Sequence, residues 1–478
     1  MGIIFLGRIA QALLALIGLR IVTTLLSPEE MGRLSLLLAV TSFFVLGLVN
    51  PVGMFINRRL HFWVETGRII QYLKLYVMYL IGVSVFSVLL LYLLNFYYVA
   101  VPGIPLVWML GLVASSIVFL TLNQTYIPSL NMLGQRGWFV SLTLAGVIFS
   151  LFLSVVFIYS IEARGELWQA GQIIGQLLIG LAGACVFFRL AKEHKKVDSS
   201  RKSMTITCSK LLAVTAFCWP LGVSVLLTWI QTQSYRFLIQ DSVGLAALGL
   251  FVVGYGVSAS LIGIFESIIS TYFIPVFYKR TATEDKYEQA MAWRAYVLAM
   301  LSSTIVLVSV IVVISDEFAR VLLDEKYISA SKYILWGALA EASRVIVGAY
   351  ALLAHAGMNT KKLILPNVIG AITAPLSIIL FVRYFGVEGV GMGLVLAGFM
   401  AIISSHIVLS KSFEIMMPWS NIFWACLVAL ILILTAEIGY IIFGPSETFL
   451  ISFIWLSVSG LVLLFILFLM LSPQIKNR

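Results

Sequence analysis

Long apolar segments separated by short polar ones run through the whole chain of 478 residues. Each apolar segment is about 20 residues or longer, which suits a helix that crosses a bilayer, whereas barrel strands would alternate over about ten residues. Backbone groups find no partner in hydrocarbon, so a spanning segment must satisfy them internally. The pattern therefore predicts an all-α polytopic membrane protein with about 14 transmembrane helices. The expected spans are 3–26, 33–56, 73–94, 106–128, 139–160, 167–188, 211–238, 245–270, 293–314, 333–356, 363–383, 387–410, 421–443 and 449–471.

The composition supports this class. Apolar residues make up 61% of the chain and charged residues 11%, against roughly 45–50% and about 25% in soluble globular proteins. A surface with so few charges must face lipid rather than water. The segments between the expected spans are short, so the chain has no room for a separate soluble domain.

Lys and Arg are unevenly divided between the two sets of loops. The even-numbered loops and the C-terminal tail hold 21 of these residues, the odd-numbered loops 6 and the spans 4, out of 31. Because basic loops stay in the cytoplasm, both termini are expected to face the cytoplasm. The formal net charge of +10 follows this pattern, so we expect no nucleic-acid partner.

The longest basic stretch, residues 189–210, divides six expected spans from eight. A weak internal repeat fits this division, since Arg20 precedes Gly32 as Arg236 precedes Gly249. Parallel repeats of this kind are common in alternating-access transporters. The sequence therefore predicts a six-helix bundle at 1–188, a basic cytoplasmic linker at 189–210 and a second six-helix bundle at 211–410. An extra helix pair with a cytoplasmic tail is expected at 411–478.

Sequence signatures of catalysis are absent. The chain has no GxxxxGK[ST] phosphate-binding loop, no HExxH and no Cys/His cluster at zinc-ligand spacing. We therefore expect no metal, no cofactor and no enzyme activity. The scattered cysteines are expected to be small apolar side chains: Cys185, Cys208, Cys218 and Cys426.

Ionisable residues within spans cost roughly 2.5–3.5 kcal/mol each on insertion scales and by default indicate function. Arg344 lies near the middle of its span and can pair with Glu341, one turn earlier. Glu266 can be the partner of an arginine or a site of ion coupling. The full set is Arg8, Arg20, Arg236, Glu266, Glu341, Arg344 and Glu437.

The other polar positions in spans leave two interpretations open. Arg20 and Arg236 lie near the outer ends of their spans, where they can reach lipid headgroups or bind a substrate. Arg8 shares a helix face with Gln11, which suits close packing or a cavity wall. A stripe of glutamines with interleaved glycines on the sixth span favours helix packing over a substrate track, and it consists of Gln169, Gly171, Gln172, Gly175 and Gln176.

Five segments together resemble the polysaccharide flippases of the Wzx type, in the superfamily that also contains MATE exporters and MurJ. In chain order they are TLLSPEEMGRLSLL, YRFLIQDSVGLAALGLF, FIPVFY, LLDEKYISASKY and YFGVEGVGMG. Each motif is loose, and their order and spacing carry the resemblance over most of the chain. The chain departs from the pattern at Tyr235, where the family usually has an acidic residue before the arginine.

The resemblance implies two bundles around a basic central cavity that accepts an undecaprenyl-diphosphate-linked oligosaccharide, moved from the cytoplasmic to the periplasmic leaflet of a bacterial inner membrane. A diphosphate needs cations, and arginine meets phosphate with a planar pair of donors. The expected partners are this cargo, membrane lipids, a polysaccharide polymerase and a chain-length regulator. Expected substrate-binding residues are Arg8, Arg20, Asn50, Arg236 and Arg344, with Glu266 and Glu341 as candidates for ion coupling.

Two other transport functions stay open. A MATE-type cation or drug antiporter would want acidic residues in its N-terminal bundle, and the first six expected spans contain none. A MurJ-type lipid II flippase would be expected to carry arginine in its second span, where this chain offers Asn50, with Arg58 and Arg59 beyond the cytoplasmic end.

The charge asymmetry of the loops gives a topological prediction. Single cysteines at Glu29, Gln240 and Glu447 should react in intact cells with a thiol reagent that does not cross membranes. Cysteines at Ser199, Thr360 and Asn477 should react only after the cells are opened. Labelling of this second set in intact cells would reverse the proposed orientation.

Overall fold

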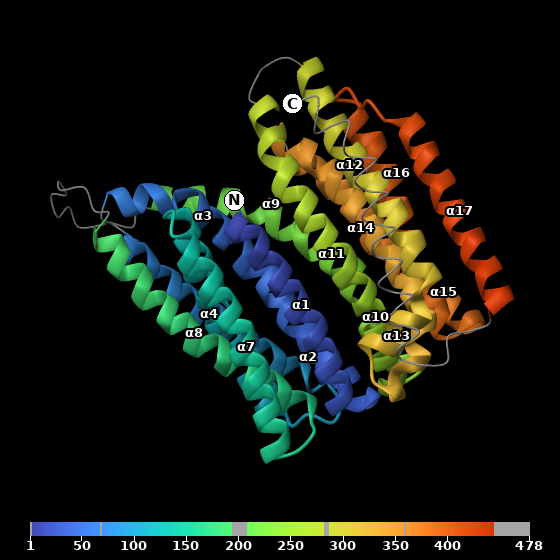
Figure 1. Ribbon diagram of the computed structural model, residues 1–478. Helices are drawn as coiled ribbons and strands as arrows, with labels where there is room; N and C mark the ends of the chain where they lie inside the picture. Colours follow the sequence, from blue (N-terminus) through green and yellow to red (C-terminus); the bar gives the residue numbers. More distant parts are fainter. Residues whose placement is uncertain (1, 67–68, 194–207, 282–285, 358–359, 444–478) are drawn as a thin grey trace. The chain divides into compact units, whose positions relative to one another are not determined.

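The computed structural model describes residues 2–66, 69–193, 208–281, 286–357 and 360–443. Within these ranges the regular structure is entirely helical (Figure 1), with no strands. The predicted all-α fold class is confirmed.

The helices follow the expected spans closely. Among the described residues, twelve helices are long and apolar enough to cross a membrane, the first at Leu6–Leu25 and the last at Val387–Ser410. The thirteenth expected span coincides with α17 (Trp419–Phe443). The fourteenth, 449–471, lies outside the described residues, as do most of the basic linker and the labelling positions Ser199, Glu447 and Asn477. The chain is a multi-pass membrane protein.

The chain divides into two compact units. Unit 1 comprises Met1–Gly18 and Glu29–Trp229, and unit 2 comprises Leu19–Pro28 and the chain from Ile230 onward. The elements that contribute to unit 1 are α1 (Gly2–Leu25), α2 (Pro28–Phe44), η1 (Val45–Val49), α3 (Asn50–Glu65), α4 (Ile69–Leu94), α5 (Leu106–Ser115), η2 (Ser116–Leu120), α6 (Thr121–Met132), α7 (Arg136–Ser160), α8 (Gly165–Glu193) and α9 (Cys208–Gln233).

Close packing of α7 against α8 accounts for the polar stripe on the sixth span. A Cβ atom added to Gly171 would lie 2.4 Å from Ser154 Cα, and one on Gly175 would lie 2.5 Å from Ser150 Cα. The amide of Gln172 donates to Ser154 Oγ at 3.1 Å. These contacts are those of a small-residue interface between membrane helices, so they support the packing interpretation of the stripe.

Two spans of unit 1 contain a π-helical turn. The segment η1 joins α2 to α3, and η2 joins α5 to α6. A π turn interrupts the regular hydrogen-bond ladder. Tyr79 of α4 donates its hydroxyl to the Leu48 carbonyl of η1 at 2.8 Å, which gives that carbonyl a partner within the apolar interior.

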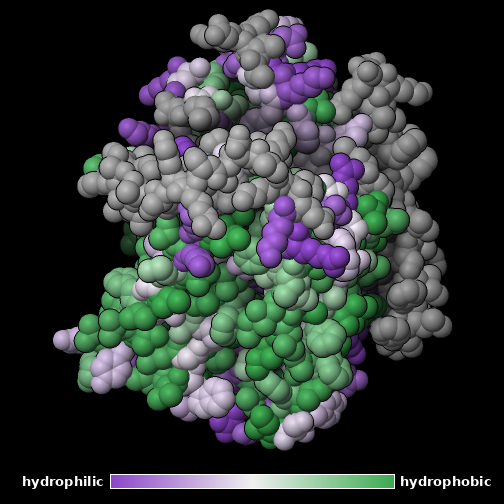
Figure 2. Space-filling model, turned by 90° about the vertical axis from the view of Figure 1, so that its left-hand side faces the viewer, coloured by the Kyte–Doolittle hydropathy of each residue, from purple (hydrophilic) through white to green (hydrophobic). Residues whose placement is uncertain are grey.

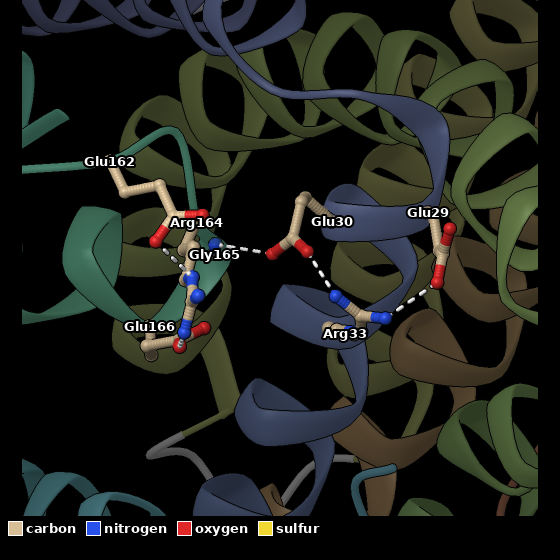
Figure 3. Close-up of polar contacts among 7 residues, drawn as sticks. All are labelled: Glu29, Glu30, Arg33, Glu162, Arg164, Gly165 and Glu166. Carbon is tan, nitrogen blue, oxygen red and sulfur yellow. Dashed lines mark hydrogen bonds and ion pairs between the residues drawn. The ribbon is translucent and has the colours of Figure 1, made fainter. Parts of the chain in front are cut away.

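The two glutamates of the SPEE segment, which carries part of the family resemblance, connect the start of α2 with Arg33 and with the start of α8 (Figure 3). The Gly165 N–H at the start of α8 donates to Glu30 Oε2 at 2.9 Å. Arg33 pairs with Glu30 and with Glu29, the latter at 2.5 Å. A Cβ atom on Gly103, whose φ is +85°, would lie 2.6 Å from Arg33 Nε, so only glycine fits the loop beside this guanidinium. The segment therefore has a structural role in unit 1.

A second ion pair lies beside this junction. Arg164, in the loop before α8, pairs with Glu162 at 2.7 Å (Figure 3). The hydrogen bond to this carboxylate raises the pKa of Arg164, and Arg164 is charged at any physiological pH.

Unit 2 is built on long helices around α11 and α14. Its elements after the end of α1 are α10 (Tyr235–Ser242), α11 (Leu245–Thr281), α12 (Lys286–Val313), α13 (Ser315–Leu322), η3 (Glu325–Ala330), α14 (Ser331–Ala356), η4 (Thr360–Leu363), α15 (Ile364–Phe385), α16 (Val387–Ser410) and α17. α14 packs against α11, α12 and α16, and α17 packs along α12. The end of α1 is attached to this unit by Lys326 Nζ and the Tyr327 hydroxyl, which donate to Thr24 O at 2.8 Å and Leu26 O at 3.0 Å.

The outer surface fits a lipid environment. On the face shown in Figure 2, hydrophobic residues cover a broad area, and hydrophilic residues gather mainly toward its two ends. Large apolar side chains are exposed along whole helices, as on α4 at Met78, Val85, Leu89 and Leu93. In water such an area would be an aggregation hazard, and in a bilayer it is the expected outer face of a spanning helix.

The α7–α8 contact predicts that Gly171→Ala is destabilising. The added methyl group would meet the Ser154 backbone, and overpacking of this kind costs about 1–3 kcal/mol. Gly82→Ala on α4 is the matched control, because no atom lies within 4 Å of its added Cβ. Thermal unfolding of the purified variants should show a lower midpoint for Gly171→Ala alone. Equal midpoints would contradict the close contact.

Candidate functional site

Arg344 lies midway along α14 and is held by two carboxylates. Its Nε donates to Glu341 Oε2 at 2.6 Å, one turn earlier on the same helix. Its terminal NH2 group pairs with Glu266 Oε2 on α11 at 2.5 Å. The sequence predicted all three residues as candidates, and the structure brings them into one cluster, which we call the Arg344 cluster.

Glu341 is the buried member of the cluster. The Tyr255 hydroxyl on α11 donates to its Oε1 at 2.5 Å. Both carboxylate oxygens of Glu341 therefore carry a hydrogen bond, and its side chain is only 9% exposed. A buried charge that is paired and fully hydrogen-bonded avoids most of its desolvation penalty.

Small residues let α11 and α14 approach closely enough for these contacts. A Cβ atom on Gly337 would lie 2.8 Å from Tyr255 Cα, and one on Gly254 would lie 2.4 Å from Ala330 O. The Ser258 hydroxyl donates to Ile334 O at 2.6 Å. Since Gly337 lies one turn before Glu341, the close backbone contact places the Tyr255 ring beside the carboxylate.

A second arginine is connected to the cluster through aromatic rings. The Nε of Arg236, on α10, donates to the Tyr235 hydroxyl at 3.3 Å. The fully buried Tyr235 ring lies 5.9 Å from the Tyr255 ring, centroid to centroid. The family resemblance led us to expect an acidic residue at Tyr235, and in this chain the Tyr235 hydroxyl accepts a hydrogen bond from Arg236.

The Arg344 cluster carries more negative than positive charge. Two carboxylates face one guanidinium, so with all three groups ionised the formal charge is −1. Arg344 and Glu266 are partly exposed, with 40% and 27% of their side chains accessible. The cluster thus combines a buried, fixed carboxylate with an accessible cation and an accessible second carboxylate.

The remaining predicted residues lie elsewhere. Arg20 belongs to unit 2 and donates to the Arg320 carbonyl on α13 at 3.5 Å. Arg8 and Asn50 belong to unit 1. Arg8 is exposed and donates to Gln11 at 3.1 Å, and Asn50 begins α3 directly after the π turn. Glu437 is exposed on α17.

Tyr255 is the member of the cluster that sequence reasoning missed. It precedes Glu266 by three helical turns, so both side chains lie on one face of α11. The sequence did contain a signal for it. Tyr255 stands between two glycines in an apolar span, on the same helix face as Glu266. In the part of the chain that the structure describes, no group of three or more His, Cys, Asp or Glu residues could hold a metal ion.

Similarity to known proteins is confined to structure. No protein-family model matches the chain, and no curated protein matches its sequence. The lipid II flippase MurJ, in an inward closed conformation, superimposes with a TM-score of 0.70 and 14% identity, covering 99% of this chain and 98% of that structure.

Multidrug transporters are similar over a smaller part of the chain. The MATE transporter VcmN of Vibrio cholerae matches with a TM-score of 0.54 and 13% identity, over 86% of this chain and 95% of that one. An inward-facing multidrug resistance transporter of the MATE family, in the MOP superfamily, matches with a TM-score of 0.55 and 13% identity. That match covers 90% of this chain and 98% of the other. This chain has the fold of the MurJ and MATE transporters. The likeness to MurJ covers a larger share of this chain than the likeness to the MATE proteins does.

The cluster geometry predicts that Tyr255→Phe destabilises the protein. Loss of the hydroxyl leaves one oxygen of the buried Glu341 without its donor, which should cost about 1–3 kcal/mol. Tyr97→Phe is the control, because that side chain is 92% exposed. Thermal unfolding should separate the two variants, and a Tyr255→Phe protein as stable as the control would mean that the bond contributes nothing.

Proposed function

We propose that the protein is a flippase that moves an undecaprenyl-diphosphate-linked oligosaccharide, such as an O-antigen, capsule or exopolysaccharide repeat unit, from the cytoplasmic to the periplasmic leaflet. The observation that carries the proposal is the likeness to MurJ, a flippase, over almost the whole of both chains. Fold likeness alone does not assign a function, so a flippase of this kind must also have a site with suitable chemistry.

The Arg344 cluster supplies that chemistry. Sugar hydroxyls cross hydrocarbon only if they are enclosed, since each unpaired polar group costs several kcal/mol there. The lipid tail can stay in the bilayer, while the diphosphate, which all such cargoes share, needs a cation. Arg344 places an accessible guanidinium in mid-span on a rigid helix, and guanidinium binds phosphate oxygens in pairs.

Lipid II is the second candidate cargo, since the MurJ structure bears that name and its diphosphate would make the same demand on Arg344. Cation export of the MATE type has less support. The acidic residues of α2 lie in its first turn, at Glu29 and Glu30, and those of α8 lie at its two ends. A cation site within the membrane part of unit 1 would need acidic groups farther from the helix ends.

We also propose the membrane in which the protein acts and the proteins that act with it. A cargo of this kind is made on the cytoplasmic face of a bacterial inner membrane, which is therefore the proposed location. Both termini are proposed to face the cytoplasm because Lys and Arg are concentrated in the even-numbered loops. A polymerase and a chain-length regulator would act on the product. Substrate contacts of Arg20, Arg236, Arg8 and Asn50 are proposed as secondary to Arg344.

Arg344→Ala should abolish transport at an unchanged protein level, because the phosphate would lose its cation. Arg344→Lys should leave partial activity, since it keeps the charge and loses the paired donors. The measurement is accumulation of lipid-linked oligosaccharide on the cytoplasmic side of cells that depend on each variant. Arg383→Ala is the control, an exposed arginine in the last turn of α15.

Full transport by Arg344→Ala would contradict a phosphate site at this residue. The cargo is tested separately, by supplying the wild-type chain to cells that lack either their lipid II flippase or their surface-polysaccharide flippase. Rescue of the polysaccharide strain alone supports the proposed cargo, and rescue of the lipid II strain alone would replace it with lipid II.

A further inference from the structure

The two carboxylates on Arg344 are bound in different ways, and the difference indicates how a phosphate could enter. Resting on the proposed function, we propose that Glu266 is the exchangeable partner of Arg344: an anionic phosphate replaces it on the guanidinium, and the displaced Glu266 binds a proton. The Arg344 cluster would then bind one proton together with its anionic ligand.

Glu341 is the fixed partner. It lies on the same helix as Arg344, at a spacing of three residues, so helix geometry alone keeps the two side chains together. Tyr255 holds its other oxygen. With 9% of its side chain exposed, Glu341 would have to break two hydrogen bonds in a buried place to leave. It therefore stays with Arg344 Nε when the ligand arrives.

Glu266 is the partner that can leave. It belongs to a different helix and meets Arg344 through one oxygen, at the terminal NH2 group. Its side chain is three times as exposed as that of Glu341, at 27%. The hydrogen bond from Arg344 to Glu266 is exposed, whereas the bond to Glu341 is partly buried. An incoming phosphate and Glu266 would therefore compete for the same terminal NH2 donor.

The charge of the cluster demands a proton when the exchange occurs. With both carboxylates ionised the cluster is formally −1, and a phosphate would meet net repulsion at short range in a medium of low dielectric. One proton on Glu266 brings the cluster to zero before the ligand is counted. The cation then becomes available without leaving an uncompensated carboxylate beside the phosphate.

Among the described residues, Arg344 is the one cation paired with Glu266. The titratable and charged groups that face it are Arg344 and Glu341 from α14 and the Tyr296 hydroxyl from α12, with Tyr255 three turns away on α11 itself. Tyr296 lies by Ser270, one turn from Glu266. Once Arg344 is bound by a phosphate, the other groups named here bring no positive charge to Glu266.

The sign of the coupling follows from this exchange. Proton and anion bind together, so the affinity for the anion should fall as pH rises through the range in which Glu266 ionises. For one linked proton the fall is about tenfold per pH unit. Glu266→Gln resembles the protonated state, so it should bind the anion without this dependence.

The test is calorimetric titration of the purified full-length chain with geranyl diphosphate, a soluble polyprenyl diphosphate. Measurement in buffers of different ionisation enthalpy gives the number of protons taken up per ligand. The wild-type chain should take up about one proton more than Glu266→Gln, as one linked group requires. The proton balance of the probe itself cancels in this difference. Glu437→Gln, a matched change at an exposed glutamate of α17, should behave as the wild type.

The outcomes separate the two proposals. Equal proton uptake by the wild type and Glu266→Gln, or proton release on binding, would overturn the exchange while leaving the phosphate site in place. Binding by Arg344→Ala as tight as that of the wild type, or no binding by the wild type, would overturn the phosphate site on which the exchange rests. If Glu266→Gln folds poorly, the wild-type chain alone tests the exchange, because its affinity for the anion should fall about tenfold per pH unit. An affinity that does not fall as pH rises would overturn the exchange.

Discussion

A guanidinium in the middle of a membrane-spanning helix is costly, so charged partners within the protein have to compensate it. Arg344 meets this constraint with two carboxylates from two helices, and much of unit 2 is arranged to bring them together. Gly254 and Gly337 allow α11 and α14 to pack closely. The Ser258 hydroxyl adds a hydrogen bond between the two helices, and the Tyr255 hydroxyl donates to the second oxygen of Glu341. The small residues of the spans are therefore as much a part of the site as its charges.

Most of the fold could be predicted from the sequence. Hydrocarbon forces helical spans of a set length, so hydropathy alone located thirteen of the expected spans close to observed helices. Contacts within one helix could be predicted as well, because the spacing of Glu341 and Arg344 implies their pairing. The division of the chain into 1–188, 189–210, 211–410 and 411–478 stays a prediction.

Contacts between helices were harder to predict. Glu266 was expected to pair with an arginine, but 78 residues separate it from Arg344, and no periodicity within a span identifies a partner so distant. Tyr255 was missed because it looks like one more aromatic residue in an apolar helix, and its contact spans 86 residues. The expected basic cavity came from the family resemblance, and the count of charged residues in the spans was the physical argument beside it. Counting does not show that Arg344 is already shared by two carboxylates.

The π-helical turn between α2 and α3 also changes the direction in which the later side chains of the second span point. An α-helix advances about 100° per residue, and a π turn accommodates an additional residue without an added helical step. Side chains after Val49 are therefore rotated relative to a helical wheel drawn through 28–56 with one constant period. A probe or substitution near Asn50 that is placed with such a wheel would be assigned to the wrong face of the helix. A separate wheel has to be drawn for the residues that follow the π turn, where Tyr79 donates to the Leu48 carbonyl.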